Sequence, residues 1–337
     1  MTLAPSGRTL IVQPLPGIGD MVWHLPHIHA IAATAMAGQV DILTKPRSQA
    51  DRLLCADPCV GRVLWLERDA GRHAGVKGIF RLVNLLRQGA YQRVWFLHAS
   101  ARYVLTAWLA GIPERIGYGI GLQPLLLSVP IRLPVEFHHA SPLVRADALL
   151  DLLKISRTEP EPRLPVLAAA RQAVAERFAG WPQPWIALGI GSSESWKQWG
   201  ATCFVELALA LRRQRSGSIF IIGGPAERVL ADEILHRVQD SGGVAADAVA
   251  LPLEQTAALL ASSCCYIGND TGVLNMAAAL ETPVLGLFGG SPPLTHSRFI
   301  HAITPPVNHS GMAAITVARV LDAFARLDRF DEDNPIA

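Results

Sequence analysis

The segment from residue 264 to residue 290 constrains the fold of this chain more than any other. A short apolar run over 264–267 is followed by a polar turn over 268–272 and a helical stretch over 273–280. A second apolar run over 284–288 ends at two glycines. This order predicts parallel strands joined by a helix, with a helix N-terminus whose unpaired N–H groups and partial positive charge suit a phosphate. The residues of that turn are Asn269, Asp270, Thr271 and Gly272.

The same alternation of apolar strands and helices runs through the whole chain in two successive series. The first series predicts strands over 10–12, 40–43, 63–66, 93–97 and 115–117, and helices over 21–34, 79–87, 101–110 and 142–154. The second predicts strands over 185–188 and 218–222 and helices over 168–178, 203–213, 226–239 and 253–261, ahead of the segment above. Between the series lies a proline-rich stretch over 158–165, unsuited to a helix or a central strand.

This pattern predicts an α/β fold with two similar domains, because alternating strands and helices build a parallel sheet covered on both faces. The two domains are expected to span residues 1–165 and 166–337. A terminal amphipathic helix over 315–327 could pack back on the N-terminal domain. In such open sheets ligands bind at the carboxyl ends of the strands.

Composition sets the broad class of the protein. Half of the 337 residues are hydrophobic and 17% are charged, so the interior is large. No apolar run approaches the roughly 18–20 residues of a membrane span, and no signal-peptide pattern opens the chain. The five cysteines are scattered, as in reduced proteins, and Cys55-x3-Cys59 lacks the second pair of a zinc site. We expect a cytoplasmic protein whose apolar content leaves room for contact with a membrane surface.

Charge is unevenly distributed along the chain. Residues 1–150 contain 15 Lys and Arg against 9 Asp and Glu, a balance of +6, and the remainder contains 15 against 19, a balance of −4. A basic first half could attract an anionic substrate or an anionic membrane. A solvated surface with chance asymmetry explains the same counts, and the two interpretations stand level.

The first predicted strand leads into a loop that carries Gly17, Gly19 and Asp20 ahead of a helix. An aspartate there either caps the helix or acts as a general base at the mouth of a cleft, and position alone favours the cap. The glycines suit a tight turn or a close approach of the backbone to a ligand. Neither this loop nor those at 189–191 and 223–224 completes a dinucleotide fingerprint, and there is no P-loop.

Two further loops carry polar groups suited to a nucleotide. Ser192, Ser193 and Lys197 could hold a pyrophosphate, with the ammonium neutralising a departing nucleoside diphosphate; a solvent-facing lysine is the alternative. Glu227 could accept hydrogen bonds from ribose hydroxyls, or could be an acid at a helix start. The histidines at 24, 27 and 29 share a predicted helix but have no nearby carboxylate or cysteine partner in the sequence, so no metal site is expected.

Taken in order and spacing, these motifs resemble glycosyltransferase family 9, the ADP-heptose:lipopolysaccharide heptosyltransferase-like proteins, over nearly the whole chain. The resemblance rests on Gly19-Asp20 with Pro26, on residues 105–118, on Lys197-Gln-Trp199, on residues 223–227, and on residues 269–272 with 277–279.

The resemblance implies a GT-B architecture: two Rossmann-like domains facing across a cleft, the first binding the acceptor and the second the nucleotide sugar. It implies that Asp20 is the catalytic base, that Ser192, Ser193 and Lys197 bind the diphosphate, and that Glu227 binds the ribose. Asp270, Thr271 and Gly272 would hold sugar and phosphates, and Leu251 would contact the adenine. Asn275 stands where the family usually has a histidine, and asparagine cannot carry its positive charge. No cofactor or metal is implied.

The function implied is an inverting transfer of a sugar, heptose from ADP-heptose, to a lipopolysaccharide core or related anionic glycan. The expected partners are the nucleotide-sugar donor, the anionic acceptor and the cytoplasmic face of the inner membrane as a peripheral contact, with no nucleic acid. Two alternatives stay open: a nucleotide-sugar epimerase of GT-B-like architecture, and a nucleotide-sugar-binding module that has lost catalysis.

Overall fold

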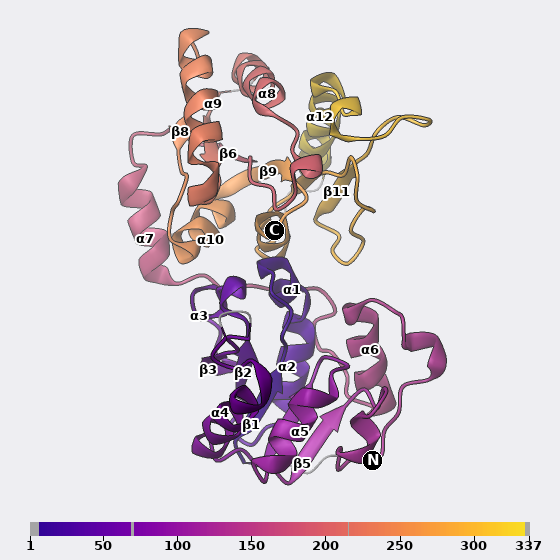
Figure 1. The fold of residues 1–337 in the computed structure, drawn as a ribbon. Coiled ribbons are helices and arrows are strands. Elements are labelled where there is room, and N and C mark those ends of the chain that lie inside the picture. The colour runs from indigo at the N-terminus through magenta and orange to yellow at the C-terminus, as the bar shows by residue number, and fades with distance from the viewer. Residues whose placement is uncertain (1–6, 69–70, 215, 334–337) are drawn as a thin grey trace. The chain divides into compact units, whose positions relative to one another are not determined.

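The computed structural model describes residues 7–68, 71–214 and 216–333, and the chain divides into two compact units, Met1–Arg163 (unit 1) and Leu164–Ala337 (unit 2) (Figure 1). Each unit holds a parallel sheet with helices packed on both of its faces. The predicted α/β fold class is therefore confirmed.

In its described part, unit 1 has a five-stranded sheet in the order β3-β2-β1-β4-β5. The strands are β1 (Thr9–Val12), β2 (Val40–Thr44), β3 (Val60–Trp65), β4 (Arg93–Phe96) and β5 (Glu114–Gly117). The helices are α1 (Ile18–Trp23), α2 (Leu25–Ala33), α3 (Ala50–Leu53), α4 (Gly75–Gln88), α5 (Ala101–Leu109) and α6 (Pro142–Leu152), with 3-10 turns at Pro46–Ser48, Gln123–Leu125 and Val135–Phe137.

Strands β1, β2 and β4 of unit 1 are buried because helices cover both faces of the sheet, whereas the edge strand β3 is partly exposed. Helices α4 and α5 lie side by side on one face, where Leu82, Leu86 and Val104 pack with Leu10 and Val94 of the strands. Helices α2 and α6 contact each other on the other side of the unit. Strands buried on both faces read as continuous apolar runs, so their positions were predictable from the sequence.

The single helix predicted over 21–34 is wrong, because the chain forms two helices there. His24 ends α1 and is also the N-cap residue of α2, and Pro26 lies in the first turn of α2. Proline has no N–H and its ring crowds the preceding turn, so a continuous helix through residue 26 would lose a backbone hydrogen bond.

In its described part, unit 2 has a six-stranded sheet in the order β11-β10-β9-β6-β7-β8. The strands are β6 (Trp185–Gly189), β7 (Ser218–Ile222), β8 (Ala246–Asp247), β9 (Ser263–Asn269), β10 (Val284–Leu287) and β11 (Ile300–Ile303). The helices are α7 (Ala168–Arg177), α8 (Ala201–Gln214), α9 (Arg228–Asp240), α10 (Leu253–Ala261), α11 (Gly272–Ala279) and α12 (Val317–Asp333), with 3-10 turns at Ser195–Lys197, Pro225–Glu227 and Met312–Ala314.

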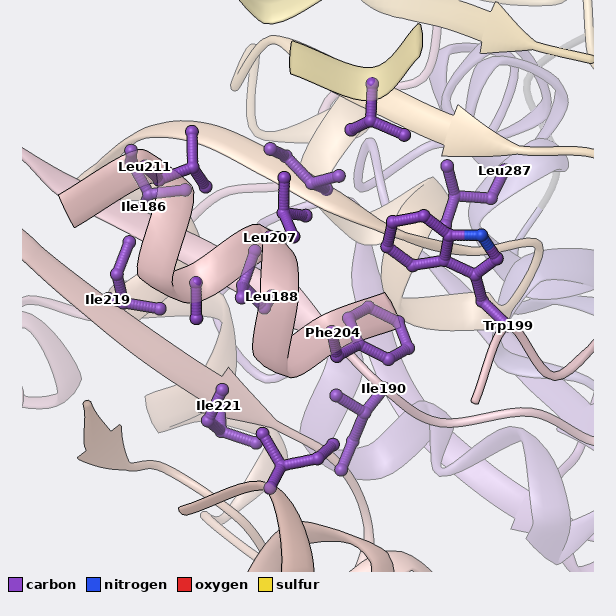
Figure 2. Close-up of a cluster of buried hydrophobic side chains, with 14 of the residues drawn as sticks. Ile186, Leu188, Ile190, Trp199, Phe204, Leu207, Leu211, Ile219, Ile221 and Leu287 are labelled. Carbon is purple, nitrogen blue, oxygen red and sulfur yellow. The ribbon is translucent and has the colours of Figure 1, made fainter. Parts of the chain in front are cut away.

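The main core of unit 2 lies between its sheet and helices α8, α9 and α12. Figure 2 shows Phe204 and Leu207 of α8 packed among Ile186, Leu188 and Ile221 of the strands. Helix α12, predicted over 315–327, contacts α8, β10 and β11 within its own unit. Helices α7, α10 and α11 form a second contacting group.

Both sheets reverse their strand order at one point. In unit 1 the chain proceeds from β1 to β2 on one side and to β4 on the other, and in unit 2 from β6 to β7 and later to β9. Two neighbouring strands whose connections leave in opposite directions open a crevice at their carboxyl ends, where ligands of α/β proteins bind. The carboxyl ends of β1 and β4, and of β6 and β9, are therefore the places to look for a site. Across the described residues, no helix combines the length and apolarity that crossing a bilayer requires.

Candidate active site

At the switch point of unit 1, the loop after β1 fixes the carboxylate of Asp20. The N–H of Gly17, the N-cap residue of α1, donates to Oδ2 of Asp20 at 2.9 Å, so Asp20, the third residue of the helix, also caps its N-terminus as half of a capping box. A Cβ on Gly17 would lie 2.8 Å from that oxygen, so glycine leaves the carboxylate room at this position. Burial raises the pKa of Asp20, and the Gly17 hydrogen bond opposes that rise. A half-buried carboxylate that binds protons more readily than usual is well suited to be a general base.

The backbone of the same turn is held by buried polar side chains. His24 Nδ1 lies 2.7 Å from the backbone oxygen of Asp20, and Gln13 Nε2 donates to that oxygen at 3.3 Å. Burial, followed by the neighbouring His27, lowers the pKa of His24 to about 4, so the ring is neutral at pH 7 and donates from Nδ1. His24 therefore positions the turn.

A group of cations gathers at the carboxyl edge of the same sheet. The pKa of His98, which follows β4, is lowered by burial and then by the positive charges of Arg145, Lys45 and Arg68. Lys45 directly follows β2, Arg68 follows β3, and Arg145 lies on α6. The buried Nε of Arg145 has no hydrogen-bond partner among the described residues. We call these three cations, together with His98, whose lowered pKa disfavours its charged form, the basic cluster. The sequence did not single out these residues as site residues. Its one signal for them was the net charge of +6 over residues 1–150.

In unit 2, Lys197 and Asp270 are brought together from loops that are far apart in sequence. Lys197 Nζ lies 2.6 Å from Oδ2 of Asp270, and both side chains are largely buried. The hydroxyl of Ser291, in the loop after β10, donates to the same oxygen at 2.7 Å. Asp270 therefore holds the Lys197 ammonium and the Ser291 hydroxyl close together at the ends of β9 and β10. The ammonium and the hydroxyl can each bind a phosphate oxygen.

Asn269 occupies the carboxyl end of β9 and is fully buried. Its Nδ2 donates to the carbonyl oxygens of Ile190 and Gly191 at 3.1 and 3.0 Å. It also donates to Oε1 of Gln198, and its Oδ1 accepts the N–H of Trp199. Asn269 thus holds the loop that carries Lys197 against β9, so its contribution to a binding site is positional.

Helix α11 begins at the turn that the sequence marked as a phosphate site. Thr271 is its N-cap residue but forms no side-chain cap, so the first-turn N–H groups of Gly272 and its neighbours point toward the loop without a capping side chain. Asn275 is buried and donates from Nδ2 to the Thr271 carbonyl at 3.0 Å. The side-chain amide of Asn275, at the position where the resemblance implied a histidine, therefore stabilises the first turn of α11.

The predicted ribose and adenine contacts lie beside the neighbouring strand. Oε2 of Glu227 accepts the N–H of Gly224 at 2.8 Å, and a Cβ on Gly191 would lie 3.7 Å from the Glu227 carboxyl carbon. The loops after β6 and β7 therefore meet at Glu227. Leu251 is half-buried and lies in the segment after β8, the strand next to β7 in the sheet.

Ser192 and Ser193 differ in their surroundings. The Ser192 hydroxyl donates to the Glu194 carbonyl at 2.6 Å and accepts the Glu194 N–H at 3.3 Å, which shapes the loop, whereas Ser193 is exposed. Next in the loop, the Trp196 ring lies against Gly290, where a Cβ would come within 2.6 Å, and Lys197 Nζ lies 5.1 Å from the centre of that ring. Trp196 and Ser291 are site neighbours that the sequence reasoning did not select.

Gly189 ends β6 for a reason that the sequence did not show. A Cβ there would lie 1.8 Å from the hydroxyl of Tyr266 on β9, and one on Gly268 would lie 2.6 Å from it. The tyrosine ring fills the space beneath the strand ends, and its buried hydroxyl lies against the side chain of Thr271. Burial raises the pKa of Tyr266, so the phenol stays protonated.

One group of side chains in the described ranges has the spacing of metal ligands, and it is separate from the residues above. His29 Nε2 and Asp57 Oδ2 are 2.7 Å apart, and the Cys59 sulfur lies within 4.8 Å of both. The sequence pattern considered Cys59 with Cys55, whereas the fold brings it to a histidine and an aspartate. His27 instead contacts Oδ1 of Asp147 at 2.9 Å.

Comparison with known proteins places this arrangement in a family. The model of glycosyltransferase family 9 (heptosyltransferase) matches residues 79–319. The lipopolysaccharide heptosyltransferase 2 of Salmonella typhimurium is 28% identical over 243 residues, which span 66% of this chain and 69% of that protein.

Solved structures share the fold over nearly the whole chain. ADP-heptose lipopolysaccharide heptosyltransferase II of E. coli has a TM-score of 0.77 at 21% identity, covering 96% of this chain and 99% of that one. E. coli heptosyltransferase WaaC with ADP-2-deoxy-2-fluoro heptose has a TM-score of 0.72 at 16% identity, covering 95% and 99%. These matches confirm the GT-B fold class. The family match covers most of the chain, and the chain belongs to glycosyltransferase family 9, the heptosyltransferase family.

Proposed function

We propose that this glycosyltransferase moves a heptosyl group from ADP-heptose to a lipopolysaccharide core or related anionic glycan, with inversion at the anomeric carbon. The observation that carries the proposal is the half-buried Asp20 carboxylate, fixed by Gly17 after β1, at the same carboxyl edge of the unit 1 sheet as the basic cluster. A base and clustered cations on one sheet edge suit an acceptor that carries both a hydroxyl and negative charges.

Unit 2 is proposed to bind the donor. Lys197, the serines and the first-turn N–H groups of α11 offer positive charge and donors to a diphosphate, and Glu227 offers a carboxylate to ribose hydroxyls. Leu251 would contact the adenine. The E. coli relative WaaC has been solved with ADP-2-deoxy-2-fluoro heptose, which supports an ADP-linked heptose as the donor here.

Unit 1 is proposed to bind the acceptor. The basic cluster would pair with its phosphates or carboxylates, and the lipopolysaccharide heptosyltransferase 2 relatives support a lipopolysaccharide intermediate as that acceptor. Because such an acceptor is a glycolipid, we propose that the enzyme works in the cytoplasm, in peripheral contact with the inner membrane.

The proposed reaction is a single displacement. Asp20 takes the proton from the acceptor hydroxyl as that oxygen attacks the anomeric carbon from the side opposite the phosphate. The bond from the anomeric carbon to the diphosphate oxygen breaks, and the electron pair leaves with ADP. Lys197 and the N–H groups at the start of α11 stabilise the charge that develops on the departing diphosphate. Asn269 keeps the lysine loop in place.

Asp20→Asn tests the proposed base. The carboxamide can still accept the Gly17 hydrogen bond but cannot take up a proton, so kcat is expected to fall by roughly 10²–10⁴-fold. Affinity for ADP-heptose, measured by calorimetry, should stay unchanged. Asp51→Asn, on the exposed face of α3, is the matched control and should turn over like wild type. Wild-type turnover in Asp20→Asn would show that the base lies elsewhere.

Product analysis in the same assay separates transfer from the two alternatives. A transferase forms a glycosidic bond only when acceptor is present, an epimerase releases an isomerised sugar without acceptor, and an inactive binding module binds donor without turnover. A thermal-shift screen over ADP-, GDP-, UDP- and dTDP-sugars tests the nucleotide, since a ligand at 100 times its dissociation constant adds about 2.7 kcal/mol of stability.

A further inference from the structure

Helix α4 of unit 1 presents an unusual outward face. Val76 and Phe80 are one turn apart and have exposed fractions of 69% and 62%. The opposite face, with Leu82 and Leu86, is buried in the core. Single exposed apolar residues are common, but a phenylalanine and a valine on one stripe of a strongly amphipathic helix leave a large apolar area in contact with water.

The rest of this outward face is basic. Lys77, Arg81 and Arg87 are exposed on α4, and the helix contains no acidic residue. The stretch 71–113 contains six Lys and Arg and no Asp or Glu. Some of these charges are committed elsewhere, such as Arg93, whose Nε lies 2.7 Å from Glu114. The three on α4 are exposed; Arg81 and Arg87 each donate to one backbone carbonyl, of Arg72 and Leu109, and no acidic side chain is paired with them among the described residues.

A groove adjoins the basic side of α4. It has a volume of about 550 Å³ and runs between the helix and the edge strand β3. Its wall includes Arg81 and Asn84 of the helix, Trp65 of the strand, and Arg72 of the preceding loop. Apolar area, cations and groove thus lie together on one side of unit 1.

We propose that α4 docks unit 1 on an anionic lipid bilayer. An interfacial helix buries its apolar side chains at the boundary of headgroups and acyl chains while its cations pair with lipid phosphates. Phe80 and Val76 supply the apolar contact, and Lys77, Arg81 and Arg87 supply the charge. The proposal rests on the proposed function in that a glycolipid acceptor would place the enzyme at such a surface. Basic helices also bind acidic proteins, but six Lys and Arg without an acidic residue over 71–113, beside the exposed Val76 and Phe80, complement the combined negative charge and apolar interior of an anionic bilayer.

Vesicle flotation tests the proposal on the full-length protein without donor or acceptor. Wild type should float with vesicles of phosphatidylcholine and phosphatidylglycerol, and should float poorly with phosphatidylcholine alone or at high salt. Phe80→Ser should weaken binding by about tenfold, the loss of part of one buried aromatic side chain. Lys77→Gln with Arg81→Gln should weaken it by roughly 30-fold, at about 1 kcal/mol for each cation.

Matched controls come from unit 2. Val307→Ser removes a valine that is 87% exposed, and Arg171→Gln removes an exposed cation on α7, so both should float like wild type. Unchanged thermal unfolding of each variant shows that the fold is intact. Absence of flotation by wild type, or equal flotation by wild type and the α4 variants, would overturn the docking surface.

Turnover on a water-soluble, deacylated acceptor keeps this result separate from the proposed function. The α4 variants should transfer to that acceptor at the wild-type rate and lose activity only on acceptor in vesicles. If wild type floats through α4 but transfers to neither acceptor, the proposed function fails and the docking surface stands. If wild type transfers to the soluble acceptor and the α4 variants float normally, the docking surface fails and the function stands.

Discussion

Asn269 uses both ends of its side-chain amide to hold the loop that carries Lys197. Because its Nδ2 faces two carbonyl oxygens, the chemical identity of the donor matters as much as the size of the side chain. Asn269→Asp places a carboxylate oxygen against those carbonyls, whereas Asn269→Ala only removes the bonds.

We expect Asn269→Ala to lower the free energy of unfolding by about 2 kcal/mol and Asn269→Asp to lower it by more, about 4 kcal/mol, because the buried charge would also face carbonyl oxygens. Urea unfolding measures both, and the donor dissociation constant should rise in the same order. Asn84→Asp on the exposed face of α4 serves as a control within about 0.5 kcal/mol of wild type. Equal stability of the aspartate and alanine variants would contradict the amide orientation.

At the residue scale, the sequence predicted side chains that stand in motifs and missed those that converge from separate loops. Asp20, Lys197 and Asp270 each follow a predicted strand and lie near glycines or the start of a helix, so the sequence identified them as candidate site residues. The basic cluster is assembled from three loops and one helix that are far apart in sequence, so no spacing in the chain encodes it. Nor could the sequence distinguish a binding asparagine from one, such as Asn269, whose hydrogen bonds are used inside the fold.

At the element scale, the junction of α1 and α2 sets the acid response of unit 1. The pKa values of His24 and His27 are lowered to about 4 and about 3, mainly by burial, from 6.5 for an unperturbed histidine. The unfolded chain therefore binds these protons at a higher pH than the folded chain does. The resulting stability is complete above pH 6.5 and is lost as the pH falls toward the folded values.

Urea unfolding between pH 7.5 and pH 5 should show a steady loss of stability below pH 6.5, to which His24 contributes about 2 kcal/mol by pH 5. His24→Asn keeps a donor for the Asp20 carbonyl but removes the titration, so its stability should fall less steeply with pH. His236→Asn, whose side chain is 75% exposed in wild type, should leave the slope as it is. A slope unaffected by His24→Asn would show that this histidine is protonated freely in the folded protein.

Elements were predicted where one physical signal dominates. Strands buried on both faces appear as apolar runs, and β1, β6 and β7 lie within a residue or two of their expected positions. The break at His24 was missed because apolar residues continue through it, and the constraint comes from the missing N–H of Pro26.

At the scale of the whole molecule, each unit has its own sheet and its own core. The strand pairings of unit 2 and its main apolar cluster involve only residues of that unit, so residues 164–337 have what a domain needs to fold alone.

We expect a fragment of residues 164–337 to unfold cooperatively and to bind ADP-heptose within about threefold of the affinity of the full chain, a difference of about 0.6 kcal/mol. It should show no transfer, since Asp20 and the basic cluster are absent. Circular dichroism and calorimetry measure the two properties, with the full-length Asp20→Asn protein as the inactive reference. A fragment that folds but binds donor far more weakly would show that unit 1 contributes to donor binding.

The alternation of strands and helices predicted two α/β domains, because that pattern has few other compact solutions. The charge asymmetry left two interpretations level. In the structure, part of the positive charge lies at the carboxyl edge of the first sheet and part lies on α4, the two places where we propose acceptor and membrane contacts.

Trp196 gives the proposed donor site an optical property. Its indole is 52% exposed, touches the loop after β10 and has the Lys197 ammonium 5.1 Å from its centre, whereas Trp95, Trp185 and Trp199 are buried. An indole in water is sensitive to nearby charge and to the polarity around it. The molecule thus contains an intrinsic fluorophore beside its candidate phosphate ligands. Because Trp108 of α5 is also 51% exposed, the emission of this one ring is the difference between the spectra of wild type and Trp196→Phe, and that difference follows occupancy of the loop in unlabelled protein.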